Sequence, residues 1–311
     1  MAKRYIDLMA ILAKMESSYG VDATPTGAAN AVLAKNVSID PLLGTDIPRN
    51  LVLPYMGNKG VLLAGNYARL AFDVEIAGAG AAGDVPGYGP LLRMCGLAQA
   101  ITVDTDVQYH PISHSFESGD LYYFLDGVRH ILLGARGKVS LNALKAVDLG
   151  HFHFEITGLQ GTITDQATPA LTLDTFQTPE PIGDTLTSLS LHGVTLPVES
   201  LSIDWGNQVE TRFLINSSGI EITGRSATGS IVMEAATMAT KDWFSIAKAG
   251  TLDALSLLHG SAAGKQVEID AANVQIGRPT QGSNQGIANY TLPLSFVPSS
   301  SGNDELLITV K

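Results

Sequence analysis

The chain of 311 residues is long enough for about two domains of ordinary size, and its 45% hydrophobic content can fill their cores. Charged residues make up only 16%, below the roughly 25% of typical soluble proteins, which indicates that neighbouring subunits cover much of the surface. The net charge of −11 argues against a protein that wraps nucleic acid by neutralising its phosphates. It suits a surface that nucleic acid touches without sticking.

Residues 1–30 are predicted to form an amphipathic helix or a docking arm at the N-terminus. Apolar side chains recur there at helical spacing, at Tyr5, Leu8, Leu12 and Met15. Charged residues interrupt the apolar run and no small-residue cleavage site follows, so neither a signal peptide nor a membrane span is expected.

The stretch Pro41–Gly65 is unusually apolar for a connection between two predicted strands. A loop of this composition either folds back on its own domain or is buried in another subunit, and the sequence leaves both alternatives open. Its candidate contact residues are Arg49, Leu51, Leu53, Tyr55 and Met56.

Most of the chain has the pattern of β-strands. Leu70–Ile76 alternates strictly, with Phe72 and Val74 on one face and Asp73 and Glu75 on the other. Further strands are predicted at Ile101–Val107, Leu121–Leu125, Gly137–Leu141, His151–Thr157, Glu221–Thr223, Ile231–Glu234, Gln266–Ile269, Tyr290–Val297 and Glu305–Val310.

Two short helices are predicted at Tyr88–Cys95 and Asp242–Ala249. Gly96 and Gly250 follow them at the position where a left-handed residue ends a helix, and Asp242 is a good N-cap.

Gly78–Gly83 has the spacing of a dinucleotide-binding G-x-G-x-x-G motif directly after a strand. Such a motif needs a helix that begins inside it, whereas Asp84–Pro90 contains two prolines and cannot sustain one. A glycine-rich turn is therefore expected, with no cofactor.

Other candidate reactive groups are scattered. His110 and His114 lie near Glu117, His151 and His153 share a strand face, and so do Asp104 and Asp106. Pro111 disfavours a helix carrying the first pair, and the histidine ligand sets are incomplete, so no metal site is expected. The single cysteine, Cys95, excludes an intramolecular disulfide and is expected to be a small buried thiol. No catalytic motif is found, which argues against an enzyme.

The chain nearly repeats itself in order. Asn36–Asp40 is matched by Ser200–Asp204, Arg49–Leu53 by Arg212–Asn216, Phe72–Ala77 by Ile231–Ala236, and Ala135–Gly150 by Ala262–Gly277. The number of residues between the two members of a matched pair decreases along the chain. It is largest for Asp40 and Asp204, smaller for Glu75 and Glu234, and smallest for Gly150 and Gly277. Collinear matches with shrinking spacing indicate two copies of one fold, the first with longer loops.

The repeat divides the chain into residues 31–161 and 188–311, two similar β domains. Residues 162–187, rich in proline, threonine and aspartate, have the composition of a linker between them.

Several segments resemble the major tail (tail tube) proteins of long-tailed, siphovirus-type bacteriophages. They are Ser17–Ala31, Val74–Gly78, Pro86–Gly96, Gly134–Leu141 and Phe154–Leu159. The likeness covers the first half of the chain, and the internal repeat extends it to the second.

The resemblance implies β-sandwich or barrel domains with a short flanking helix, stacked in rings around a channel for DNA in the virion tail, after synthesis and assembly in the host cytoplasm. Since such rings present six units, two per chain predict a ring of three chains. Asp73, Glu75 and Glu234 are the candidate channel-lining residues. Implied partners are further copies of the chain and the tail terminator, tape measure and tail-tip proteins. DNA would pass without specific binding, and no membrane is involved.

Two other classes remain open. A tail-tip or baseplate ring protein would share the fold without forming long tubes. A carbohydrate-binding or adhesive β-sandwich would present an exposed aromatic platform, which an aromatic content of 6% does not favour.

Overall fold

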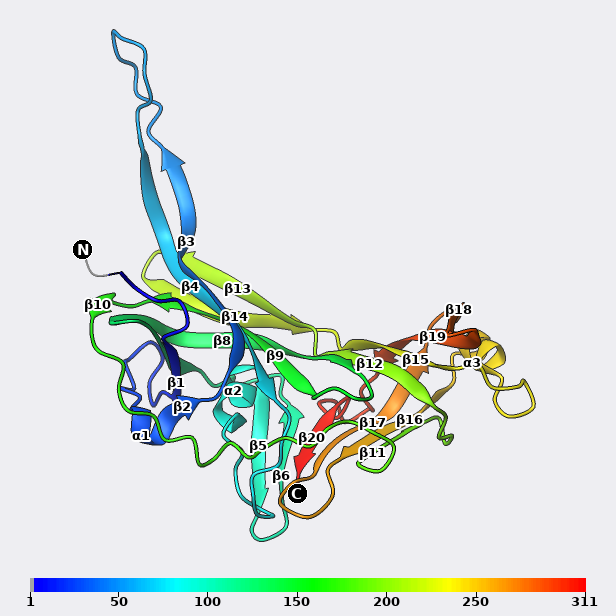
Figure 1. Ribbon diagram of the computed structural model, residues 1–311. Helices are drawn as coiled ribbons and strands as arrows, with labels where there is room; N and C mark the ends of the chain where they lie inside the picture. The colour runs from blue at the N-terminus through cyan, green and yellow to red at the C-terminus, as the bar shows by residue number, and fades with distance from the viewer. Residues whose placement is uncertain (1–2) are drawn as a thin grey trace.

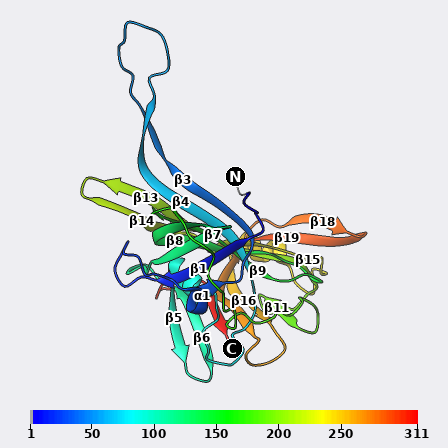
Figure 2. The same cartoon turned by 60° about the vertical axis from the view of Figure 1, so that its left-hand side comes forward.

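Antiparallel strands dominate the computed structural model, which describes residues 3–311 (Figures 1 and 2). One large sheet of 18 strands accounts for nearly all of them, and β13 and β14 form a separate two-stranded sheet. The elements are β1 Met9–Met15, α1 Gly27–Asn30, β2 Ala31–Val32, β3 Lys35–Pro48, β4 Val61–Glu75, α2 Gly89–Met94, β5 Leu97–Thr102, β6 Asp106–Pro111, β7 Gly119–Leu125, β8 Val128–Leu144, β9 His151–Gln160, β10 Thr164–Asp165, β11 Thr187–Leu191, β12 Val198–Asp204, β13 Asn207–Leu214, β14 Ser217–Arg225, β15 Thr228–Glu234, α3 Trp243–Ala249, β16 Leu252–His259, β17 Val267–Ile276, β18 Thr280–Asn284, β19 Ile287–Phe296 and β20 Leu307–Val310.

The strand pairings form two series with the same order. In the first half the neighbours run β3-β4-β9-β8-β7-β1. In the second half they run β12-β15-β19-β17-β16-β11. A short terminal strand joins β8 in the first series (β10) and β17 in the second (β20), and α2 and α3 each follow the second strand.

The pairing registers also agree between the two series. Asp40 pairs with Arg69 in β3 and β4, and Asp204 pairs with Thr228 in β12 and β15. Asp40 and Asp204 are equivalent residues of one sequence match. Arg69 and Thr228 are equivalent in another, because they are separated by the same number of residues as Glu75 and Glu234. Two of the four sequence matches thus lie at equivalent places in the strand pairings.

The match between Ala135–Gly150 and Ala262–Gly277 is out of register. The hairpin that opens β8 begins at Val128, and the corresponding hairpin opens β17 at Val267. The spacing from Val128 to Val267 is longer than the spacing from Ala135 to Ala262. A glycine-rich turn before a strand produced the sequence likeness by chance.

The two series join edge to edge. In the pairing of β12 with β8, Leu201 lies opposite Leu144 and Asp204 opposite Ser140. The C-terminal strand β20 pairs with β6 of the first half, and the β13–β14 hairpin packs against β8 and β9 (Figure 1). The sheet is therefore continuous from one half to the other.

The core lies on the apolar face of the sheet, beneath α2. Leu70, Phe72 and Val74 of β4 are fully buried, and the phenyl rings of Phe72 and Phe154 stack with centroids 5.8 Å apart. The strict alternation of the predicted strand Leu70–Ile76 is confirmed, since β4 covers all but its last residue.

The N-terminal helix prediction was wrong. Met9–Met15 is a strand, β1, which pairs along its whole length with β7. Ala10, Ile11, Leu12 and Ala13 are all buried because both faces of this strand meet apolar side chains, so a helical spacing of apolar residues was a coincidence within a continuous apolar run.

The predicted strand Ile101–Val107 was also wrong. β5 and β6 form a hairpin there, and the turn between them places Asp104 at a φ of +55°. Both predicted short helices are confirmed: the Asp242 carboxylate accepts a hydrogen bond from the Ser245 N–H at 2.9 Å, and Gly96 and Gly250 have left-handed φ values. Across residues 3–311 the helices fall far short of the length that crossing a membrane requires.

Residues 166–186 run extended along the first half before β11 begins (Figure 1). The Gly87 N–H donates to the Thr175 carbonyl, and the Phe176 ring lies against Gly87, where a Cβ would meet it at 2.4 Å. Further on, Ile182 exchanges backbone hydrogen bonds with Val147 and Asp148. This segment is therefore fastened along its course.

The Gly78–Gly83 loop packs against the β16–β17 turn of the second half. The Gly80 N–H donates to the Gly264 carbonyl at 2.8 Å, and a Cβ on Gly78 would lie 2.2 Å from the same oxygen. Gly78 and Gly80 allow the backbone of this loop to lie close to the backbone of the β16–β17 turn, and no helix begins inside the motif.

Gly78→Ala should therefore lower the free energy of unfolding by roughly 1 to 3 kcal/mol, because two backbone segments must separate. Gly183→Ala is the matched control, since a Cβ there meets nothing within 4 Å. Chemical denaturation of both variants measures the difference, and equal stability would show that the loop contact is not tight.

Candidate functional site

A row of polar side chains crosses both halves of the large sheet. Residues paired directly opposite one another share a face, and the pairings link Lys35, Asp73, His153, Ser140, Asp204 and Thr228 from β3 through β15. Since residues two apart on a strand share a face, Glu75 lies on the same face as Asp73. We call this surface the polar face.

Asp73 is the most buried acid of the polar face, with 8% of its surface exposed. It accepts a hydrogen bond from the Asn36 amide at 2.7 Å, and its other oxygen lies 2.6 Å from Nδ1 of His153. Burial alone would raise the pKa of Asp73, but the hydrogen bonds from Asn36 and His153 hold it below its ordinary value. The carboxylate is thus ionised and engaged within its own chain.

Glu75 and Glu234 are partly exposed and hold equivalent places in β4 and β15. Glu75 lies opposite His151, whose pKa is lowered chiefly by burial, so that the imidazole is neutral at neutral pH. Within residues 3–311 neither glutamate forms an ion pair.

Two basic groups of the polar face, Arg69 and Lys138, are matched by acids of the same chain, whereas Lys35 forms no ion pair within residues 3–311. The Arg69 guanidinium lies 2.8 Å from Asp40 and 3.5 Å from Glu155, and Nζ of Lys138 lies 3.2 Å from Glu155. Such pairing cancels the positive charge locally and leaves Glu75 and Glu234 as free negative groups.

A second candidate surface is the projecting arm formed by β3, β4 and the loop between them, which we call the β3–β4 arm. Figures 1 and 2 show it extending far from the rest of the molecule. The strands continue to Pro48 and resume at Val61, and the tip exposes 40% of Leu51, 37% of Leu53, 67% of Tyr55 and all of Met56. Arg49 is exposed as well. Of the two alternatives from the sequence, folding back is excluded.

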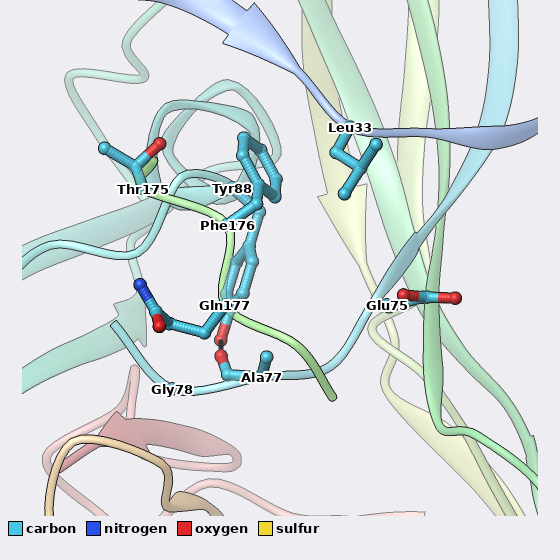
Figure 3. A pocket seen from close by; sticks show the side chains of 8 residues that line it. All are labelled: Leu33, Glu75, Ala77, Gly78, Tyr88, Thr175, Phe176 and Gln177. Atoms are coloured by element: carbon cyan, nitrogen blue, oxygen red, sulfur yellow. Dashed lines mark hydrogen bonds between the residues drawn. The ribbon is translucent and has the colours of Figure 1, made fainter. Parts of the chain in front are cut away.

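The remaining candidates do not converge on a reactive centre. Glu117 binds Arg93 instead of a histidine, and no cluster among residues 3–311 could hold a metal ion. Cys95 is buried, which raises the pKa of its thiol far above the ordinary value. A small cavity beside Gly78, shown in Figure 3, has a volume of about 10 Å³ between Tyr88 and Phe176. It has room for one water molecule and none for a nucleotide.

Sequence reasoning missed a cleft of about 670 Å³ between α3 and the end of β17. Ala247, Lys248, Gln275, Ile276 and Arg278 line it. It also missed Trp205, which is fully buried against Phe152 with ring centroids 6.2 Å apart. A tryptophan beside Gly206, directly after a strand, was the available signal.

The exposed apolar arm and the polar face of the sheet are both surfaces through which a protein can assemble with further copies of itself. A family model described as "Phage tail tube protein" matches residues 7–297. The chain belongs to this family: it is a non-enzymatic structural component of the phage tail tube, located in the virion tail, as its resemblance to these proteins predicted. A comparison with curated proteins gave no match.

Asp73→Asn should destabilise the subunit by about 1 to 3 kcal/mol at pH 7, because a charged hydrogen-bond acceptor is lost. Since folding lowers the pKa of Asp73, its contribution is present above the unfolded value of about 3.8 and is lost as the pH falls through the lower folded value. The variant should therefore lose less stability than the wild type between pH 5 and pH 3, as measured by denaturation. An identical pH dependence would contradict this role.

Proposed function

We propose that the tube consists of stacked rings of three chains, each chain contributing two tube-type β domains to a pseudo-sixfold ring. The observation that carries this proposal is the equal strand order and register of the two series. Residues 31–161 and 188–311 are the two domains, residues 1–30 the N-terminal arm and residues 162–187 the linker. A head-to-tail contact closes such a ring only at a fixed number of units.

Within the tube, the polar face lines the channel and carries Asp73, Glu75 and Glu234. Its free carboxylates repel the phosphates of DNA, and its Arg69 and Lys138 groups are held in ion pairs. A lining with free basic groups would instead bind DNA through the release of counterions. DNA passes through this lumen without specific binding. The tail terminator and tail-tip proteins contact the ends of the tube, and the tape measure protein fills it during assembly.

Glu75→Lys combined with Glu234→Lys should create salt-sensitive DNA binding by assembled tubes and slow genome delivery, and adding Asp73→Lys should strengthen the effect. The paired control is Asp174→Lys with Asp184→Lys, in exposed parts of the linker. DNA retention at low and high salt and the rate of ejection are the measurements. Normal delivery by the charge-reversed tubes would remove these residues from the channel surface.

Stacking is assigned to the tip of the β3–β4 arm, which crosses into the next ring. Burial of its aliphatic and aromatic side chains stabilises that contact by about 25 cal/mol per Å² of apolar surface. Arg49, Leu51, Leu53, Tyr55 and Met56 are the contact residues.

Deleting residues 46–60, or replacing Leu53, Tyr55 and Met56 by Asp, should leave folded subunits or single rings that fail to elongate. Val147→Asp is the control, because Val147 is 95% exposed in a different loop. Tubes of normal length from the arm variants, seen by electron microscopy, would show that the tip is dispensable.

Electron microscopy of the purified wild-type protein tests the proposed assembly as a whole. Long tubes with an open lumen are expected. Isolated rings that never elongate, under any condition that stabilises them, would favour a tail-tip or baseplate ring. An adhesive module has little support, since Trp205 and Trp243 are both buried.

A further inference from the structure

The contact between the two halves extends beyond the pairing of β12 with β8. After Asp204 the chain continues alongside β8: the Trp205 N–H donates to the Val139 carbonyl at 3.3 Å, and the Asn207 amide donates to the carbonyls of Cys95 and Gly137 at 2.6 and 3.2 Å. Residues 201–207 thus lie along the edge of β8 from Leu144 back to Gly137.

This segment of the second half fills the space between α2 and β8. Cys95 ends α2 and Gly137 lies in β8, so the Asn207 side chain bridges the two elements. Asn207 has only 8% of its surface exposed, and Trp205 is fully buried. The first half therefore has no open cleft at this place.

The equivalent place in the second half is open. With Val128 of β8 aligned on Val267 of β17, Gly137 and Val139 correspond to Ile276 and Arg278, and both of these line the cleft between α3 and β17. Further along, Leu141 lies opposite Phe152 of β9, whose equivalent in β19 is Tyr290, and Tyr290 pairs with Gln281 of β18. Gln281 is therefore the equivalent of Leu141. Within residues 3–311, β18 pairs with β19 alone and is exposed along its whole length.

The strand equivalent to β12 also has a free edge. This strand is β3, which pairs with β4 alone among the described residues. With Asp204 aligned on Asp40, Leu201, Ile203 and Asn207 correspond to Val37, Ile39 and Leu43 of β3. Each half of the chain therefore has two strand edges at which it can join another half: β3 and β8 in the first half, and β12 and β18 in the second. Within one chain β12 pairs with β8, and the outer edges of β3 and β18 have no partner among the described residues.

We propose that β3 of a neighbouring chain pairs with β18, and that the base of its β3–β4 arm, residues 41–43, fills the cleft between α3 and β17. The occupant is a second copy of this chain, and the contact repeats between chains the contact seen between the two halves. This inference rests on the proposed ring and assigns the surfaces that close it.

The charges of the two surfaces are complementary. Lys248 and Arg278 are exposed at the cleft, and within residues 3–311 neither forms an ion pair. Asp46, exposed just beyond the arm base, forms no ion pair within residues 3–311, whereas Asp40 on the other side is paired with Arg69. Opposite charges at the rim favour this orientation of two otherwise uncharged strand edges.

The hydrogen bond from the Trp205 N–H to the Val139 carbonyl has no equivalent in the proposed contact between chains. Pro41 takes the place of Trp205 and has no N–H to donate to the carbonyl of Arg278. Proline is tolerated at a sheet edge, and the contact between chains is expected to be smaller and more easily separated than the one within the chain.

Ile39→Cys combined with Gln281→Cys tests the register. This pair is equivalent to Ile203 and Leu141, which lie directly opposite in the sheet, and directly opposite antiparallel residues have Cα atoms about 4.5 to 5.5 Å apart, within reach of a disulfide. Oxidised rings should give dimers and closed trimers on non-reducing gels. Asp204→Cys with Ser140→Cys is the control within one chain, and Ile39→Cys with Ser300→Cys is the control out of register.

Electron microscopy of the same samples distinguishes a wrong pairing from a wrong assembly. Tubes or rings that form without a disulfide between positions 39 and 281 would overturn the pairing while the tube stands. Covalent species larger than trimers would support the pairing and contradict the ring of three. A chain that never forms rings or tubes would contradict the proposed assembly and with it this pairing.

Hydrogen exchange of the unsubstituted protein gives an independent readout. The amides of residues 280–284 should exchange at least tenfold more slowly in tubes than in free subunits, whereas those of the exposed turn at residues 299–302 should not change. In addition, Arg278→Glu should weaken ring formation at low salt more than Lys145→Glu, a reversal in another exposed loop. Unchanged exchange in β18 on assembly would exclude the pairing.

Discussion

The edge-to-edge pairing of β12 with β8 is the interaction on which the rest of the structure depends. A strand edge presents unsatisfied N–H and C=O groups, and it must be covered or paired. Here one half of the chain satisfies the edge of the other, through three registered pairs and the hydrogen bonds of Trp205 and Asn207. Among the described residues, β3 and β18 each keep one edge without a partner strand, so a single chain is an open segment of a larger sheet.

The polar face follows from this continuity. Because paired residues share a face, the pairing of Ser140 in β8 with Asp204 in β12 keeps the polar side chains of both halves on one surface. Arg69 and Lys138, two basic groups of this surface, are neutralised by ion pairs with acids on it. In the proposed tube, such a surface faces a polyanion without a cluster of free cations that could hold it.

Much of the fold could be predicted from local pattern, because alternation over a half-buried strand is a strong signal. It gave β4, β7, β9 and β15, and the capping residues gave both short helices. β1 was missed because a strand buried on both faces has no alternation, so its apolar run fitted a helix equally well. The free acids were found as a strand face, but the bond from Asp73 to His153 depends on a register between strands 80 residues apart, which no local pattern contains. The cleft between α3 and β17 is recognised as an unoccupied contact site only by comparison with the equivalent place in the first half, which Trp205 and Asn207 fill.

The number of chains in one ring tests the central claim most directly, because it depends on each chain supplying two equivalent units. Native mass spectrometry of rings released from the tube, or the symmetry of a cryo-electron microscopy reconstruction, gives this number. Three chains are expected, with threefold symmetry and six similar β domains around the lumen. Six chains in a ring would contradict the claim and would place the second half of each chain outside the channel wall.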